Sequence, residues 1–201
     1  MTQKVLGNLA QGLVFIVSAP AGTGKTTLTR MLTTEFDCVE ESVSCTTRRP
    51  RIGEIPGVDY HFLTQQEFDQ KVTEDDFLEH AEVFGFCYGT SRQYVKDAQD
   101  LGKHVVLVID TQGAMILKDQ GFQAVFIFIS PPSIEELKQR LINRNTEDVK
   151  TIEKRLSWAE GEMKMSSKYD YVIINQDLDT AYQVLRSIVI AEEHRQINVH
   201  V

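Results

Sequence analysis

Short apolar runs that alternate with helical segments are the feature of this sequence that most limits its fold. The runs occupy residues 13–18, 104–110, 124–129 and 171–175, and residues 41–45 form a weaker candidate. Continuous apolar runs of this length are typical of strands buried on both faces of a parallel sheet. All of them are far shorter than the ~20 residues of a membrane helix. We therefore expect an α/β fold with a doubly wound parallel sheet flanked by helices.

The helical segments are expected at residues 25–36, 91–101, 133–141, 151–165 and 178–195. Between Pro50 and Tyr94 the alternation of long apolar runs and helices is interrupted. Short strand-like pieces are separated there by glycine, proline and one helix. Thr64 and Glu67 have the spacing of a capping box for that helix. This segment predicts a small antiparallel subdomain inserted into the parallel core. The polar stretch 140–154 predicts a mobile lid.

Residues 18–27 read SAPAGTGKTT and lie between the first strand and the first helix. They match the phosphate-binding pattern G-x-x-x-x-G-K-[ST], except that Ala19 replaces the first glycine. A strand, a glycine-rich turn and a helix N-terminus direct backbone N–H groups at a polyphosphate, Lys25 adds a cation, and Thr26 can bind Mg²⁺. A chance match would leave the flanking strand and helix unexplained. The predicted phosphate-binding loop comprises Ala19, Pro20, Ala21, Gly22, Thr23, Gly24, Lys25, Thr26 and Thr27.

The methyl group of Ala19 is harmless if its φ is not positive.

A second cluster places Arg48, Arg49 and Arg51 beside the hydroxyls of Ser44, Thr46 and Thr47. A solvated basic turn would explain the arginines alone. Guanidinium groups next to hydroxyls favour an anion site. The chain as a whole carries a net charge of −8, which argues against binding to nucleic acid polymers or anionic membranes.

The remaining composition gives little sign of metal or disulfide chemistry. The three cysteines have no C-x-x-C spacing, and the five histidines form no ligand pattern. The N-terminus lacks the apolar run of a signal peptide. We expect a cytoplasmic protein with reduced thiols.

Several motifs in order along the chain resemble guanylate kinases. They read SVS-x-TTR-x-PR-x-GE-x-x-G-x-DY-x-F, FLEHAEVFG-x-x-YGTS, ID-x-QGA, RL-x-x-R and VIIN-x-D-x-D-x-A, besides the phosphate loop. The similarity extends over residues 12–192. It implies the reaction ATP + GMP ⇌ ADP + GDP with Mg²⁺. It also implies a core at about 12–41, 94–132 and 159–192, a GMP-binding subdomain at 42–93 and a lid at 133–158.

The resemblance also implies roles for individual residues. The catalytic charges would be Lys25, Arg48, Arg144 and Arg155. The GMP phosphate would lie among Arg48, Arg51, Tyr60 and Tyr88, and guanine would be read by Ser44, Glu79 and Thr90. ATP would contact Arg140, Arg144 and Asn175 besides the loop. Asp110 would serve guanine, the Mg²⁺ shell through water, or both.

Guanine chemistry agrees with this assignment. Its N1–H and N2–H₂ groups are donors that a carboxylate at Glu79 can accept, whereas adenine would leave the carboxylate unpaired. Taken alone, Glu79 would be an ordinary strand residue, Tyr60 and Tyr88 would be packing aromatics, and Arg140 would be a helical salt-bridge partner.

The chain departs from the family pattern at three positions. Ala19 replaces a glycine of the family pattern, Val108 replaces the first acid of D-I-D, and Asn145 replaces the glycine of R-G-T.

Two alternative functions stay open: an inactive guanylate kinase-like interaction module, and a related kinase of a ribose bisphosphate. The sequence leaves open the oligomeric state and the choice between GMP and dGMP.

Overall fold

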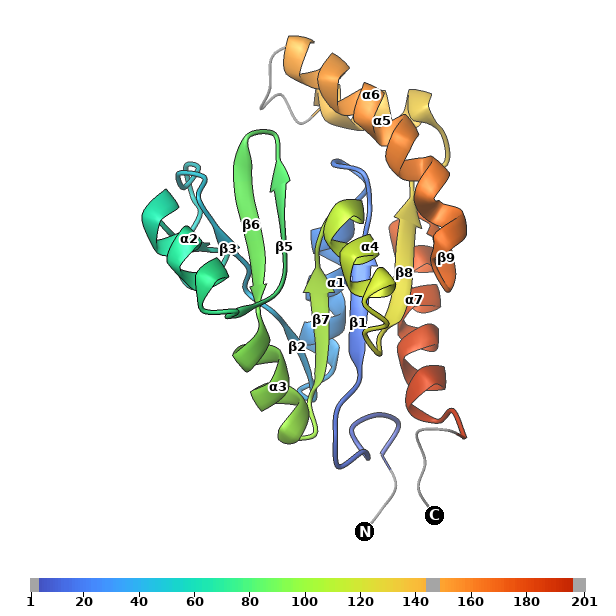
Figure 1. Ribbon diagram of the computed structural model, residues 1–201. Helices are drawn as coiled ribbons and strands as arrows, with labels where there is room; N and C mark the ends of the chain where they lie inside the picture. Colours follow the sequence, from blue (N-terminus) through green and yellow to red (C-terminus); the bar gives the residue numbers. More distant parts are fainter. Residues whose placement is uncertain (1–3, 144–148, 197–201) are drawn as a thin grey trace.

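The computed structural model describes residues 4–143 and 149–196. A parallel sheet with the order β2-β7-β1-β8-β9 forms the centre of the fold (Figure 1). Its strands are β2 (Val39–Glu41), β7 (His104–Val108), β1 (Val14–Ser18), β8 (Val125–Ser130) and β9 (Tyr171–Ile174). All neighbouring pairs are parallel, so the predicted doubly wound sheet is confirmed.

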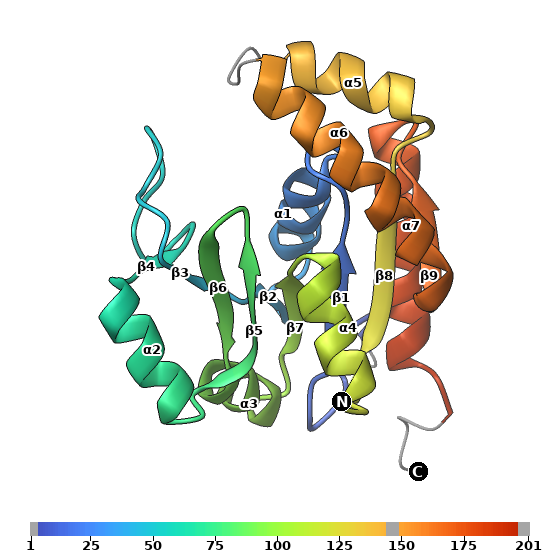
Figure 2. The same ribbon diagram turned by 45° about the horizontal axis from the view of Figure 1, so that its top comes forward.

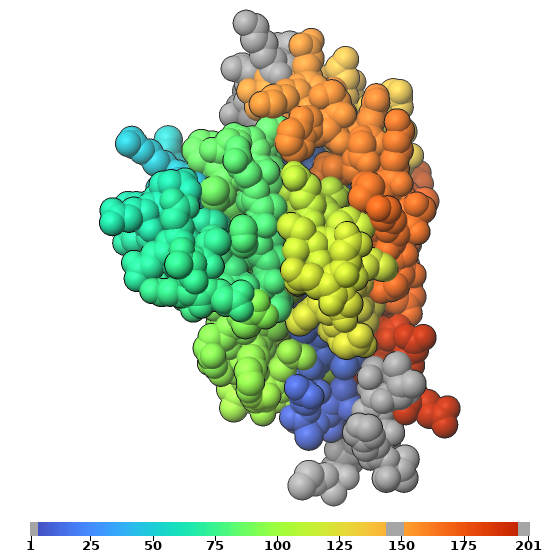
Figure 3. Space-filling model, in the orientation of Figure 1, coloured from blue at the N-terminus to red at the C-terminus, as the bar shows by residue number. Residues whose placement is uncertain are grey.

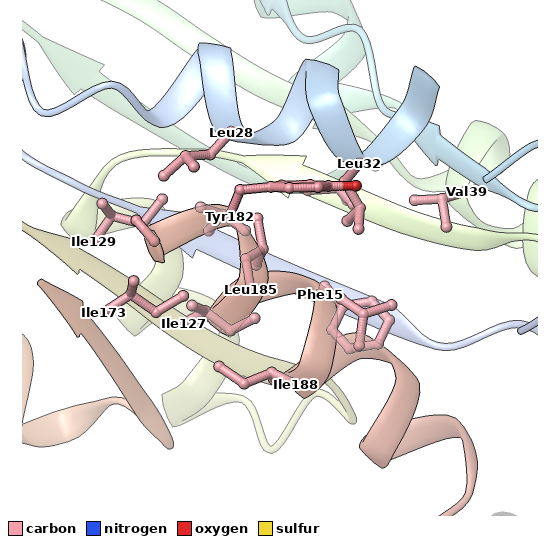
Figure 4. Close-up of a cluster of buried hydrophobic side chains, with 14 of the residues drawn as sticks. Phe15, Leu28, Leu32, Val39, Ile127, Ile129, Ile173, Tyr182, Leu185 and Ile188 are labelled. Atoms are coloured by element: carbon pink, nitrogen blue, oxygen red, sulfur yellow. The ribbon is translucent and has the colours of Figure 1, made fainter. Parts of the chain in front are cut away.

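Alternate side chains of each central strand supply two hydrophobic cores. Phe15 and Val17 face the core that α1 (Lys25–Glu35) and α7 (Leu178–Glu193) cover. Val14 and Ile16 face the opposite core, under α3 (Arg92–Asp100) and α4 (Thr111–Asp119). Figure 4 shows the first core, in which side chains of α1 and α7 meet above the sheet. Because both faces are buried, the central strands read as continuous apolar runs.

A second sheet with the order β4-β3-β6-β5 lies beside the first. Its strands are β3 (Cys45–Thr46), β4 (His61–Phe62), β5 (Phe77–Val83) and β6 (Phe86–Ser91). The β5–β6 and β3–β6 pairs are antiparallel, whereas β3 and β4 run parallel. The inserted subdomain is therefore mainly antiparallel, as predicted, with one parallel pair. Helix α2 (Gln65–Thr73) begins at the predicted capping box of Thr64 and Glu67.

The predicted strand at 41–45 was wrong in its bounds. The N–H of Ser42 still donates to Val106 in the first sheet, and the carbonyl of Ser44 already accepts from His61 in the second. The segment therefore crosses between the two sheets. Helix α4 was not predicted at all. It begins at Asp110, whose carboxylate accepts from the N–H of Gly113 at 2.8 Å.

Helices α5 (Ile134–Asn143) and α6 (Val149–Lys164) lie beyond the carboxyl ends of β1 and β8 (Figures 1 and 2). A short 3₁₀ turn, Met165–Lys168, joins α6 to β9. Arg144 and Asn145, to which the sequence assigned parts of the lid, lie outside the described residues. Within the described ranges, no helix is both long and apolar enough to cross a membrane.

Candidate active site

A cavity of about 510 Å³ lies where the phosphate loop, the second sheet, the end of β7 and α6 meet. In α/β sheets, ligands bind outside the carboxyl ends of the strands, and this cavity is at that edge. Most of the predicted site residues line it, from segments far apart in the chain. These are Ala19, Ala21, Lys25, Ser44, Arg48, Arg51, Tyr60, Glu79, Tyr88, Asp110 and Arg155.

The phosphate loop has the backbone that its sequence requires. Gly22 and Gly24 have φ values of +95° and +91°, which residues other than glycine rarely adopt. Gly24 caps α1 without any side-chain hydrogen bond, so the helix N-terminus keeps its N–H groups for an anion. Ala19 does not have a positive φ, and its methyl group is buried in the first core. The condition under which alanine is expected to be harmless is therefore met.

Asn175 fixes the loop from the opposite side. Its side-chain N–H donates to the carbonyl of Thr23 at 2.6 Å, and its own carbonyl accepts from Arg140 at 2.9 Å. Arg140 also pairs with Glu136 on its own helix, so the salt-bridge role is present too. Asn175, Arg140 and Gly24 help to line a second cavity of about 420 Å³ on this side of the loop. Of the predicted ATP contacts, Asn175, Arg140 and the phosphate loop are thus brought together, whereas Arg144 lies outside the described residues.

Lys25 lies among carboxylates. Its ammonium group is 3.4 Å from the carbonyl of Ile109. Burial lowers the pKa of Lys25, while the negative charges of Glu162 and Asp110 oppose this change. Burial also raises the pKa of Asp110. One oxygen of Asp110 accepts from the N–H of Gly113, whereas Oδ2 is buried without a hydrogen-bond partner.

Arg48 is held by an acid that the sequence analysis did not single out. Its two terminal nitrogens donate to the two oxygens of Glu54, at 3.0 and 2.8 Å, and the ring of Tyr60 lies 5.3 Å from the guanidinium. The Nε of Arg48 is buried and has no partner. Tyr88 lies next to Tyr60, with 6.0 Å between ring centroids. The glutamate of the quoted G-E motif was the available signal for Glu54.

Glu79 is buried, with 5 % of its surface exposed. The Thr90 hydroxyl donates to its Oε1 at 2.6 Å. The other oxygen points at α4, because a Cβ added to Gly113 would lie 2.5 Å from it. Burial raises the pKa of Glu79 to about 7, although the Thr90 hydrogen bond opposes the change. Ser44 lines the same cavity, so the three predicted guanine-reading residues are brought together.

Comparisons with known proteins identify the family of the chain. The guanylate kinase family model matches residues 11–192. The chain is 57 % identical to a guanylate kinase of Protochlamydia amoebophila over 94 % of this chain and 95 % of that protein. It is 50 % identical to one of Chlamydia trachomatis over 97 % and 98 %. The chain belongs to the guanylate kinase family.

A crystal structure of guanylate kinase from Anaplasma phagocytophilum superimposes on this fold with a TM-score of 0.77 and 35 % identity. The match covers 92 % of this chain and 88 % of that one. Guanylate kinases are ATP:GMP phosphotransferases, so the main prediction of activity is supported and the two alternatives are not.

Three other residues that line the cavity were not predicted from the sequence. Glu162, Trp158 and Phe84 line the cavity, and burial raises the pKa of Glu162 to about 7 although Lys25 opposes this change. On α6, Trp158 follows Arg155 by three residues and Glu162 follows Trp158 by four. This helical spacing was the one signal in the sequence that could have linked Trp158 and Glu162 to Arg155.

Proposed function

We propose that the chain carries out the guanylate kinase reaction in the cavity of about 510 Å³, between the phosphate loop and the second sheet. The observation that supports this most is that Lys25, Arg48 and Glu79, from three distant segments, line one space. The phosphates of ATP would bind the N-terminus of α1. Its adenosine would extend toward the second cavity, near Asn175. GMP would enter on the side of residues 42–93.

The guanine site is proposed to consist of Glu79, Thr90 and Ser44. Thr90 donates to one oxygen of Glu79, which leaves lone pairs of the carboxylate for the donors N1–H and N2–H₂ of guanine. Adenine offers no such donor pair, so it would leave the buried carboxylate without partners. Discrimination of this kind can reach several powers of ten.

The GMP phosphate is proposed to lie between Arg48, Arg51 and the hydroxyls of Tyr60 and Tyr88. Glu54 holds two nitrogens of Arg48, so the buried Nε is the atom of this guanidinium that still lacks a partner. A phosphate monoester is already an anion near neutral pH, and the reaction therefore needs no general base. Lys25 and Arg155 would stabilise the charge that develops on the transferred group, together with Arg144.

The donor set fits Mg²⁺. The described residues include no group of three or more His, Cys, Asp or Glu side chains placed to hold a metal ion. A nucleotide-bound Mg²⁺ needs only one or two protein oxygens, because phosphates and water supply the rest. The hydroxyl of Thr26 and the unpaired Oδ2 of Asp110 are the proposed ligands, the second through water. Bound Mg²⁺ neutralises charge on the phosphates of ATP.

A coupled assay with MgATP and a panel of acceptors tests the proposed function. GMP should react, whereas AMP, UMP and ribose bisphosphate should react at least about a hundredfold more slowly; dGMP completes the panel. Equal rates with AMP would contradict the guanine site, and no turnover with any acceptor would favour an interaction module. We expect the reaction to take place in the cytoplasm, where ATP and guanine nucleotides are available.

A further inference from the structure

Two aromatic rings connect the GMP side of the cavity with α6. Phe84, at the tip of the β5–β6 hairpin, stacks on Trp158 with 4.4 Å between ring centroids and an interplanar angle of 27°. The ammonium group of Lys154, one turn earlier on α6, lies 5.2 Å from the Phe84 ring centroid. Figure 3 shows the hairpin and α6 in contact at this place.

The stack is not part of a hydrophobic core. Phe84 and Trp158 are 38 % and 39 % exposed, whereas α6 is anchored to α5 by a separate buried cluster of Leu137, Leu141, Ile152 and Ala159. Phe84 also has a φ of +55°, a conformation that is unfavourable for a bulky residue. Phe84 and Gly85 form the two-residue turn between β5 and β6, and such turns require a positive φ at both positions. The turn explains the backbone of Phe84, but it does not explain why a bulky aromatic side chain stands there.

The position of Trp158 on its helix supplies an explanation for the aromatic side chain of Phe84. Arg155, Trp158 and Glu162 are three and four residues apart, so they share the face of α6 that lines the cavity. Lys25 lines the same cavity from the phosphate loop. The orientation of α6 therefore determines how far these charged groups are from GMP in its proposed site.

We propose that Phe84 and Trp158 form an aromatic clasp that holds this face of α6 over the GMP site. Both are positioning residues, which act through Arg155 and Glu162. The inference rests on the proposed function, because it assumes that GMP binds beside the second sheet. When the clasp is broken, α6 keeps its contacts with α5, but its charged face is no longer fixed over the cavity.

Steady-state kinetics of Phe84→Ala and Trp158→Ala test the clasp. An aromatic pair of this kind is expected to change an equilibrium by roughly two- to tenfold. We therefore expect kcat/KM for GMP to fall about two- to tenfold in either variant, with a higher KM for GMP and an unchanged KM for MgATP. Trp158→Phe should recover most of the loss, because it keeps a ring. The double variant should be no worse than either single variant.

Phe86→Ala is the matched control. Phe86 lies two residues along the same hairpin and is 40 % exposed, but it does not line the cavity. Its removal should leave the kinetics of GMP unchanged. If Phe84→Ala behaves like Phe86→Ala, or if the two single losses multiply in the double variant, the clasp is wrong.

Fluorescence gives a readout that does not depend on turnover. Trp158 is the only tryptophan of the chain, so its emission reports the stack directly. Phe84→Ala should change this emission in the absence of substrates and Phe86→Ala should not; equal spectra for both would contradict the clasp. An unaltered parent chain that fails to phosphorylate GMP would instead contradict the proposed function.

Discussion

The ionisation of Glu79 makes a quantitative prediction about GMP. The raised pKa of about 7 means that this carboxyl group is half protonated near neutral pH in the absence of substrate. Only the carboxylate can accept from N1–H and N2–H₂ of guanine at once. The ionised fraction is about 0.9 at pH 8 and about 0.1 at pH 6. The contribution of Glu79 to kcat/KM for GMP should therefore fall about tenfold over this range.

Glu79→Gln separates this effect from other titrations. The variant replaces an acceptor oxygen by a donor amide and should lose about 2–4 kcal/mol of transition-state binding, which is roughly 30- to 900-fold in kcat/KM. It no longer titrates at this position. The second pKa of a phosphate monoester lies near 6, but that ionisation is the same for both enzymes. The ratio of parent to variant therefore isolates Glu79.

The assay is a coupled measurement at limiting GMP and saturating MgATP, from pH 6 to pH 8.5 at constant ionic strength. The parent-to-variant ratio should rise about tenfold from pH 6 to pH 8 and then level off. Thr90→Val should move this rise to higher pH, because the Thr90 hydroxyl lowers the pKa of Glu79. A ratio that stays constant with pH, or within about threefold of one, would refute the assignment.

Three further predictions concern the loop and the core. Lys25→Ala should lower kcat by at least about 10²-fold with an unchanged melting temperature; near-native turnover would contradict the loop assignment. Gly24→Ala should raise KM for MgATP roughly tenfold, because φ is +91° and the new Cβ would lie 2.7 Å from Nδ2 of Asn175, whereas the control Ala19→Gly should not. Burial lowers the pKa of His104. As the pH falls, this histidine therefore binds a proton in the unfolded chain at pH values at which it is still neutral in the folded state. The melting temperature of the parent should therefore fall relative to that of His104→Gln as the pH drops below about 6.5, and a difference that does not change with pH would contradict this.

The sequence predicted the central sheet well because strands that are buried on both faces are continuous apolar runs, which can be recognised locally. Four of the five expected strand segments coincide with an observed strand to within two residues at each end, and each of them is a continuous apolar run. The fifth, at 41–45, failed because the chain changes sheets within three residues, and nothing in the local pattern marks such a crossing. Helix α4 was missed because it contains Gly113, which weakens a helical pattern, whereas α2 and α3, which have the same length, were predicted.

The candidate site was predictable where its residues lie in ordered motifs. Glu79, Thr90 and Arg48 were found in this way, and the structure brings each of them to the cavity or its wall. Phe84 and Trp158 were not found, because 74 positions separate them and only the three-dimensional packing puts their rings together. Arg48 and Glu54 are only six positions apart, but the sequence pattern does not predict that two nitrogens of Arg48 donate to the two oxygens of Glu54.

The raised pKa of Glu79 has opposite consequences for stability and for recognition. The folded state binds the proton of Glu79 more tightly than the unfolded chain does, whose carboxyl titrates near 4.5. The contribution of Glu79 to the stability of the substrate-free protein therefore decreases as the pH rises from about 4.5 to 7. Guanine donors reverse this effect, because they supply the hydrogen bonds that the buried carboxylate lacks. A carboxyl group that destabilises the empty fold thus favours binding of the base that satisfies it, and adenine cannot provide the same compensation.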